Sequence, residues 1–445
     1  MLLPAHCCQA ARRGYARDMT FRFVHAADLH LDSPFKGIRE TEPRVAAILR
    51  RATFEAYERV IDLCIDRRVD ALLVAGDVFD GADRILAAQI QFVRGLERLH
   101  AAGIRAFICH GNHDPLDGWG ARLKMPPSVH QFGERAEAVP VDPQSSTGPV
   151  VCGISYPTRE IRSSLVPEFP APEAGRVTIG MLHANVGTNT GHEAYAPCTV
   201  EDLAATGYDY WALGHVHTRG ILRDAAPLVV YPGNTQGRHP NERGPRGVYL
   251  VEVDDHGTMS PEFVAVDSVR WEQVDVQING IEDDGALVSR LEALVDDLVT
   301  QANDRHLVYR VRLEGRGPVH ESLARADNID GLVDQLNQAW GHRQPVAFCG
   351  GILDESRSQL DRAALVESKD FVGDFLSLSD AASADEALLA ELQQELAPLY
   401  DNARARRFLG NSLPATDDMR DLVAAAEDVA LGLLVDDAEA DEAGS

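Results

Sequence analysis

Five short apolar runs each end at an acid, a histidine or an asparagine, and this pattern limits the fold more than any other feature of the chain. Each run has the length and the β-branched or aromatic content of a buried strand. Amphipathic helical patterns lie between them, with apolar stripes from Val45 to Cys64 and from Ile85 to Leu99. This alternation predicts an α/β fold over residues 20–265, with central sheets flanked by helices. The runs are Phe21–Ala27, Ala71–Ala75, Ala106–Cys109, Val177–Leu182 and Tyr210–Leu213.

The polar residues that close these runs form an ordered set: Asp-x-His, Gly-Asp-x-x-Asp, Gly-Asn-His-Asp, His and Gly-His-x-His. In open α/β sheets, ligands bind outside the carboxyl ends of the strands, so we expect these side chains to converge on one site. Each piece alone is a weak signal, since a lone histidine such as His183 is more often structural than a ligand. Five pieces in this order are a strong one. The set comprises Asp28, His30, Asp77, Asp80, Asn112, His113, Asp114, His183, His215 and His217.

Four further segments complete the domain plan. Residues 1–19 have too short an apolar run for a secretory signal, and we expect a disordered extension or a start assigned too early. Residues 266–365 alternate between strand-like and helical patterns, which predicts a small α+β module that we expect to cap the site or contact the substrate. Residues 366–435 carry leucine stripes typical of helices that pack together or bind a partner. Residues 436–445 are acidic, and we expect a disordered tail.

The charge distribution bears on the partners of the chain. The net charge is −27, which is unusual for a protein that binds nucleic acid. From Asp267 onward, 37 acids face 15 bases, whereas residues 1–266 hold 32 acids and 27 bases. The catalytic part could therefore face a polyanion. Cysteines within apolar runs are typical of reduced thiols, and no apolar stretch is long enough to cross a bilayer, so we expect a cytoplasmic protein.

The ordered set resembles the calcineurin-like metallophosphoesterase superfamily. Asp114 is similar to the residue found in its nuclease and phosphodiesterase branches, where phosphoprotein phosphatases usually carry Glu. Longer stretches of the sequence resemble a narrower family, the YhaO group of SbcD-type DNA-repair exonucleases, and the motifs cover most of residues 20–250. The stretches that carry this likeness are His25–Gly37, Tyr195–Cys198, Tyr208–His217 and Tyr231–His239. The resemblance implies a calcineurin-like phosphoesterase sandwich.

The resemblance also implies two metal ions and a catalytic residue. One ion would be bound by Asp28, His30, Asp77 and His217, and the second by Asp77, Asn112, His183 and His215, with Asp77 bridging them. Imidazole, carboxylate and amide oxygen without cysteine suit Mn²⁺ best, with Fe, Zn or Mg as alternatives. His113 would protonate the leaving oxygen or stabilise the transition state.

Asp80 departs from the family pattern, because many SbcD-type nucleases have His three residues after the bridging aspartate. A carboxylate would repel a phosphate, so we expect Asp80 to orient His113 or His30 instead. Arg238 and His239 lie in a turn that could contact the phosphate backbone, since Arg matches phosphate geometry. A plain surface turn is an equally good interpretation.

Three functions remain open at this stage. The resemblance implies a DNA exonuclease that works with an SMC-like coiled-coil ATPase of the SbcC/YhaN type, bound through the C-terminal helices, and it is compatible with a homodimer. The alternative is a phosphoesterase acting on a small nucleotide or another non-DNA phosphoester. A catalytically silent scaffold is disfavoured, because all seven ligand positions and His113 are present.

Overall fold

The computed structural model describes residues 21–35, 43–81, 85–118, 123–187, 195–359, 362–368, 370–401 and 414–443. These residues form two compact units. The first runs to Gly315 and includes Glu321–Ser356, and the second comprises Arg316–His320 with the residues from Arg357 onward. The extension that we expected at 1–19 lies outside the described residues.

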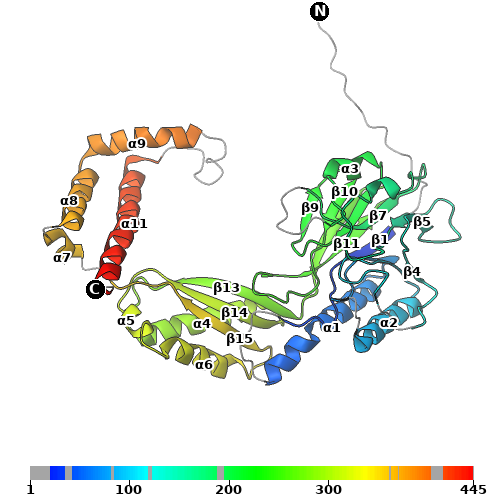
Figure 1. Cartoon of the computed structure of the whole chain (residues 1–445), viewed down its shortest axis with the longest axis horizontal. Coiled ribbons are helices and arrows are strands. Elements are labelled where there is room, and N and C mark those ends of the chain that lie inside the picture. The colour runs from blue at the N-terminus through cyan, green and yellow to red at the C-terminus, as the bar shows by residue number, and fades with distance from the viewer. Residues whose placement is uncertain are drawn as a thin grey trace, which may run out of the picture. The chain divides into compact units, whose positions relative to one another are not determined.

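The region that we expected to be catalytic, residues 20–265, contains two six-stranded sheets (Figure 1). The first has the order β12-β11-β1-β2-β3-β4 and the second the order β5-β6-β7-β8-β10-β9. The first sheet consists of β1 (Phe21–Ala26), β2 (Ala71–Ala75), β3 (Arg105–Cys109), β4 (Val129–Gln131), β11 (Gly247–Val253) and β12 (Met259–Ala265). The second consists of β5 (Glu137–Pro140), β6 (Val150–Gly153), β7 (Thr178–His183), β8 (Tyr210–Gly214), β9 (Gly220–Arg223) and β10 (Leu228–Tyr231).

Apolar side chains join these sheets to the helices in layers. Helices α1 (Pro43–Asp66) and α2 (Leu86–Ala101) cover the outer face of the first sheet, where Ile61 and Leu96 join its buried cluster. Phe107 and Met181 belong to a second cluster between the two sheets. The outer face of the second sheet packs against α3 (Val200–Ala205) and against a short 3-10 helix, η1 (Val166–Glu168), through a cluster that includes Leu203 and Val166. The expected α/β sandwich is confirmed.

The strands that carry the predicted site run parallel within each sheet. β1 pairs with β2 and β2 with β3, while β7 pairs with β8 in the other sheet. Their carboxyl ends therefore lie at one edge of each sheet. The five expected runs agree with these strands to within one residue at each end.

A small module follows the catalytic region within the first unit. Its strands β13 (Val269–Gln277), β14 (His306–Glu314) and β15 (Ala347–Asp354) form a parallel sheet in that order. Helices α4 (Asp284–Ala302), α5 (His320–Leu323) and α6 (Asn328–Trp340) lie in the connections. We expected this module to be α+β, and its strands are in fact parallel with helices in the connections. The sequence pattern did not show this, because it did not reveal β15 and α6.

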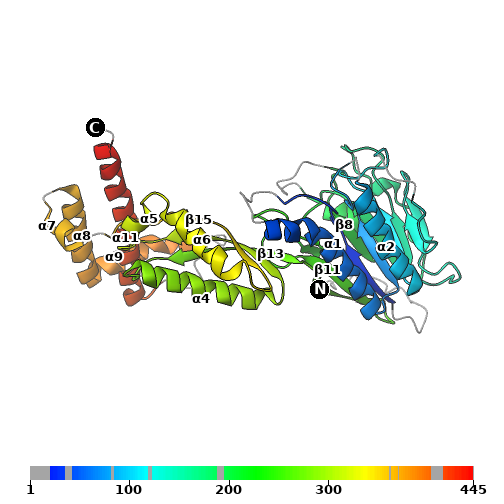
Figure 2. The ribbon, with the colours of Figure 1, turned by 90° about the horizontal axis from the view of Figure 1, so that it is seen from below.

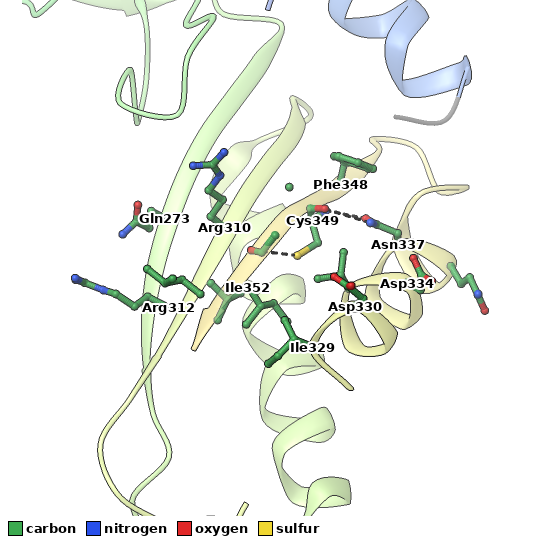
Figure 3. A pocket seen from close by; sticks show the side chains of 16 residues that line it. Gln273, Arg310, Arg312, Ile329, Asp330, Asp334, Asn337, Phe348, Cys349 and Ile352 are labelled. Carbon is green, nitrogen blue, oxygen red and sulfur yellow. Dashed lines mark hydrogen bonds between the residues drawn. The ribbon is translucent and has the colours of Figure 1, made fainter. Parts of the chain in front are cut away.

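A cavity of about 1170 Å³ lies along β15 and α6 of this module. Figure 3 shows Arg310 and Arg312 on one side of it, with Asp330 and Asp334 of α6 on the other. Ile352 of β15 lies between them. None of the predicted metal ligands lines this cavity.

The second unit is helical (Figures 1 and 2). It contains α7 (Arg362–Glu367), α8 (Phe371–Ala384), α9 (Glu386–Asp401) and α11 (Thr416–Ala443). Arg362 joins three of them through ion pairs of 2.6 Å to Glu427 and 2.7 Å to Asp380. None of the helices among the described residues is both long and apolar enough to span a bilayer.

One expectation for the C-terminus needs correction. Helix α11 continues through residues 436–443, within the stretch that we expected to be a disordered tail. That stretch is rich in Ala and Glu, which are strong helix formers, and they prolong the helix. Acidity alone is therefore a poor guide to order at this position.

Candidate metal centre

All seven predicted metal ligands lie at the strand ends described above. Six of them are buried, and His215, the most exposed of the six, has 9% of its surface accessible. His217 is half-buried. Asp28 and His30 follow β1, Asp77 follows β2, Asn112 follows β3, His183 ends β7, and His215 and His217 follow β8.

One group of donors surrounds His30. Its Nε2 lies 3.1 Å from Nε2 of His217 and 3.9 Å from Oδ2 of Asp77. Asp28, His30 and His217 each offer a ligand atom, and these atoms lie within 4.8 Å of one another. These are the residues that we expected around one of the two metal ions.

The second group surrounds His183. Its Nε2 lies 3.0 Å from Oδ1 of Asn112 and 3.3 Å from Oδ2 of Asp77. The same Asn112 oxygen lies 3.2 Å from Nδ1 of His215. Asp77 Oδ2 therefore contacts both groups, as a bridging ligand must.

In three of these histidines, the ring nitrogen that faces away from the donor group, Nδ1, has an acceptor beside it. Nδ1 of His30 lies 3.0 Å from Asp80, Nδ1 of His217 lies 2.6 Å from Glu242, and Nδ1 of His183 lies 3.0 Å from the Ala75 carbonyl oxygen. An acceptor at Nδ1 places the hydrogen there and leaves the lone pair on Nε2. All three Nε2 atoms point into the donor groups, so these residues fit divalent ions.

The backbone is locally strained where it presents these ligands. Asp28, His30, Asp77 and His215 have positive φ angles of 51°, 44°, 52° and 98°. Residues other than glycine rarely adopt this region, and such strain concentrates at functional sites. It indicates that the surrounding packing forces these side chains into place.

The glycines of the motifs make room for His183. A Cβ atom at Gly76, Gly111 or Gly214 would overlap the His183 side chain. At Gly111 it would also overlap Oδ1 of Asp77. The glycine that precedes the ligand in three of the five motifs is thus a packing requirement of one buried imidazole.

The pKa values reflect burial opposed by neighbouring charge. Burial alone would raise the pKa of Asp77, but the nearby His183 holds it well below its usual range. Burial alone would lower the pKa of His183, but the Asp77 carboxylate raises it to about 9. Burial raises the pKa of Asp28 to about 6 and lowers that of His30 to about 3. Burial and the charges of neighbouring ligands thus shift these pKa values in opposite directions.

Asp80 connects several groups at the rim of the centre. Its Oδ1 lies 3.0 Å from Nδ1 of His30 and 3.5 Å from Nδ1 of His113. Arg238 donates to the same oxygen at 3.0 Å, and Ser33 donates to Oδ2 at 2.8 Å. Asp80 thus contacts both histidines that we expected it to orient. The Arg238 guanidinium makes a third cation beside Asp80 unfavourable, although His30, Asp80 and His113 also cluster.

The predicted catalytic residue, His113, lies beside the metal ligands. Its backbone N–H donates to Oδ1 of Asp77 at 3.0 Å, and its Nδ1 lies 3.3 Å from the Asp80 carbonyl oxygen. Its side chain is 35% exposed, whereas six of the seven ligands are buried. It is therefore open to an incoming substrate.

The three remaining residues expected at the site or near the substrate have different positions. Asp114 is fully buried and accepts hydrogen bonds from the backbone of Val78 and Gly111, at 3.0 Å and 2.8 Å, so it ties the loops after β2 and β3 together. His239 accepts a hydrogen bond from the Asn241 backbone at 3.1 Å, within its own turn. Arg238 also donates to Ser33. Of these three, only Arg238 contacts the rim of the centre through Asp80.

Two residues at the centre escaped the sequence analysis. Glu242 contacts His217, and Ser33 contacts Asp80 and Arg238. Ser33 lies in the His25–Gly37 stretch that carries the family resemblance, but nothing there singles it out as a site residue, and Glu242 belongs to no spaced motif.

Comparison with known proteins agrees with this geometry. The calcineurin-like phosphoesterase domain matches residues 21–219, and the middle domain of metallophosphoesterase YhaO matches residues 271–348. An uncharacterized metallophosphoesterase YhaO of Bacillus subtilis (strain 168) is 33% identical over 375 residues, which cover 83% of this chain and 89% of the relative. The chain belongs to the YhaO family of calcineurin-like metallophosphoesterases. The resemblance seen in the motifs is confirmed, and the small module after the catalytic region contains the YhaO middle domain.

More distant relatives share the catalytic region. The DNA double-strand break repair protein Mre11 of Aeropyrum pernix is 29% identical over 232 residues, which cover 48% of this chain and 53% of that protein. This chain thus matches about half the length of that relative. Among solved structures, a dimetal phosphatase from Danio rerio matches with a TM-score of 0.34 and 12% identity, over 54% of this chain and 95% of the other. That likeness is too small to carry an argument.

Proposed function

We propose that this YhaO-family chain is a two-metal-dependent phosphodiesterase that hydrolyses DNA phosphodiester bonds, working as a DNA-repair exonuclease. The carrying observation is the position of Asp77 Oδ2, 3.3 Å from Nε2 of His183 and 3.9 Å from Nε2 of His30. One carboxylate oxygen thus faces both donor groups. The Mre11 relatives, named for DNA double-strand break repair, support the substrate class.

The donors favour two divalent ions, Mn²⁺ first, with Fe, Zn or Mg as alternatives. When bound, such a pair would clamp the phosphoryl oxygens and lower the pKa of a bound water. The chain's own part is to hold seven ligands in a largely buried cluster whose imidazole tautomers are set in advance. This preorganisation avoids rearrangement during the reaction.

His113 is the residue that we assign to the leaving group. Its Nδ1 faces Asp80, at 3.3 Å from the carbonyl oxygen and 3.5 Å from the carboxylate, which leaves Nε2 for the substrate. From there it can donate a proton or a hydrogen bond to the departing oxygen. Asp80 fixes the ring, and its carboxylate is paired with Arg238, which reduces its repulsion of a phosphate.

The helical unit is the part that we assign to a partner, an SMC-like coiled-coil ATPase of the SbcC/YhaN type. Phe371, Leu378 and Val429 expose 69%, 66% and 67% of their surface there. Exposed apolar side chains of this size are typical of protein interaction sites. A partner that supplies basic surface would also compensate for the net charge of −27 on DNA. A homodimer and a cytoplasmic location are parts of the same proposal.

A second function, hydrolysis of a small nucleotide or another non-DNA phosphoester, is favoured by one observation. Many SbcD-type nucleases have His three residues after the bridging aspartate, whereas this chain has Asp80. The Asp80 carboxylate accepts hydrogen bonds from Arg238 and Ser33. A site without that histidine lacks one hydrogen-bond donor for a DNA phosphate.

One assay separates the two functions. Purified protein with Mn²⁺ is given linear duplex DNA, bis-p-nitrophenyl phosphate and p-nitrophenyl phosphate, with and without the ATP-loaded ATPase partner, beside His113→Ala. Degradation of DNA that His113→Ala loses supports the exonuclease. Hydrolysis of the chromogenic esters alone, even with the partner, supports the small-substrate enzyme. No hydrolysis of any substrate contradicts both and favours a regulatory scaffold.

A further inference from the structure

We propose that Glu242 is a positioning residue that aims His217 at the metal centre. This rests on the proposed two-metal site. Oε1 of Glu242 lies 2.6 Å from Nδ1 of His217, and Oε2 accepts the backbone N–H of Arg238 at 2.6 Å. One carboxylate thus holds a proposed metal ligand with one oxygen and its own loop with the other.

The chemistry of imidazole explains what this contact does. A carboxylate at Nδ1 keeps the hydrogen there, so Nε2 presents its lone pair. Nε2 of His217 points at Nε2 of His30, 3.1 Å away. Asp80 lies on the corresponding side of His30, with its Oδ1 at 3.0 Å from the His30 Nδ1. Two carboxylates from different loops therefore turn two imidazoles toward one point.

Contacts besides the one between Glu242 and His217 Nδ1 also hold the loop that carries Glu242. Gln236 accepts the backbone N–H groups of Ser268 and Val269 at 2.8 Å and 3.1 Å. Trp271 donates to the Gly237 carbonyl oxygen at 3.0 Å, and Gly244 donates to the Trp271 carbonyl oxygen at 2.9 Å. Both ends of the loop are thus tied to the first strand of the YhaO middle domain or to the residues that lead into it.

A glutamine cannot replace this carboxylate. Both of its contacts are with donors, the His217 Nδ1–H and the Arg238 N–H, and both carboxylate oxygens accept. Glutamine has one acceptor oxygen and one NH₂ group, so one of the two donors would face another donor. Glu242→Gln keeps the size of the side chain and removes both this double acceptance and the negative charge of the carboxylate.

The matched control is a glutamate that contacts a histidine elsewhere. Oε1 of Glu137 lies 3.0 Å from Nε2 of His130 on the surface of the catalytic region, and neither residue belongs to the proposed centre. Glu137→Gln and Glu137→Ala therefore report what the loss of a histidine–glutamate contact does by itself.

The experiment titrates Mn²⁺ into chelator-treated full-length protein by calorimetry, for wild type, Glu242→Gln, Glu242→Ala and both Glu137 variants. We expect Glu242→Ala to weaken one of two sites by about 10–100-fold, the range for lost partners of metal-binding histidines, and Glu242→Gln to weaken the same site. The Mn²⁺ affinity of the second site, and of both sites in the Glu137 variants, should stay within about twofold of wild type, because changes at distant positions act independently.

Two results would overturn the inference. Unchanged affinity at both sites in Glu242→Ala would show that Glu242 positions nothing, and loss of both sites together with a lowered Tm would show a merely structural role. A long-range ¹⁵N–¹H spectrum of the histidine rings adds an independent readout, because only a positioning role predicts loss of the Nδ1–H tautomer of His217 in the variants. If wild type binds no Mn²⁺, the proposed metal centre itself is wrong.

Discussion

Nδ1 of His183 lies 3.0 Å from the carbonyl oxygen of Ala75, and this contact joins the two sheets at the metal centre. Ala75 ends β2 of the first sheet, whereas His183 ends β7 of the second. Because a carbonyl only accepts hydrogen bonds, Nδ1 carries the hydrogen and Nε2 faces Asn112 and Asp77. The packing of the two sheets thus sets the direction of a ligand.

Gly111→Ala tests the close packing around this imidazole. The added Cβ would overlap both His183 and Asp77, so we expect Mn²⁺ affinity to fall by at least about tenfold and stability by about 1–3 kcal/mol. Gly133→Ala is the matched control, since a Cβ there meets nothing within 4 Å. Equal Mn²⁺ affinity in the two variants, measured by calorimetry, would contradict the packing argument.

His113→Ala separates chemistry from metal binding. A lost general acid typically lowers kcat by about 10²–10⁴-fold, and because His113 is not a proposed ligand, the bound Mn²⁺ should be unchanged. The measurement is kcat on bis-p-nitrophenyl phosphate together with metal content by mass spectrometry. His130→Ala, at a histidine outside the centre, serves as the control. A drop in metal content that accounts for the lost activity would contradict the assigned role.

Asp80→Ala removes the shared partner of His30, His113 and Arg238. We expect weaker Mn²⁺ binding at the His30 site by about 10–100-fold, because the imidazole loses the group that fixes its tautomer. Asp254→Ala removes an exposed aspartate that accepts hydrogen bonds within its own turn, and it should leave both sites intact. Wild-type affinity in Asp80→Ala would show that packing alone orients His30.

His25 should make the fold sensitive to mild acid. It is fully buried, 3.0 Å from the Tyr210 hydroxyl and 3.1 Å from the Leu213 carbonyl oxygen, and burial lowers its pKa from 6.5 to about 3. Below pH 6.5 the unfolded chain binds a proton that the folded chain does not, so the free energy of unfolding falls as the pH falls from 6.5 toward 3. His25→Gln abolishes this linkage.

The linkage has a defined size. Between pH 7 and pH 5, the wild type should lose about 2 kcal/mol more stability than His25→Gln, from about 1.4 kcal/mol per pH unit below the unfolded pKa. Urea unfolding of both proteins in EDTA at the two pH values measures the difference. A constant gap between the two proteins would mean that folding does not change the pKa of His25.

The strands and the ligand cluster could be predicted because two periodic signals coincide. The apolar runs define β1, β2, β3, β7 and β8, and each places its polar residue at the carboxyl end of a parallel strand. Where signals do not coincide, prediction stops. β15 has one residue more than β14 at Gly350 and Gly351, which shifts the register between the two strands. The alternation of apolar residues along β15 is therefore broken.

The partners of the ligands could not be predicted for a different reason. Glu242 lies 25 residues from His217, and its position depends on how Gln236 and Trp271 tie its loop to the next module. Asp114 has the motif position of a site residue, yet it binds backbone N–H groups. Such assignments depend on tertiary contacts, which the spacing of residues does not encode.

Anomalous diffraction from crystals soaked in Mn²⁺ tests the central claim most directly. We expect two peaks about 3.5–4 Å apart on either side of the Asp77 carboxylate, one beside His30 and His217, the other beside Asn112 and His183. Crystals of Asp77→Asn should show reduced occupancy at both positions. Absence of a peak beside Asp77 in the wild type, or a single ion that contacts none of these histidines, would contradict the account.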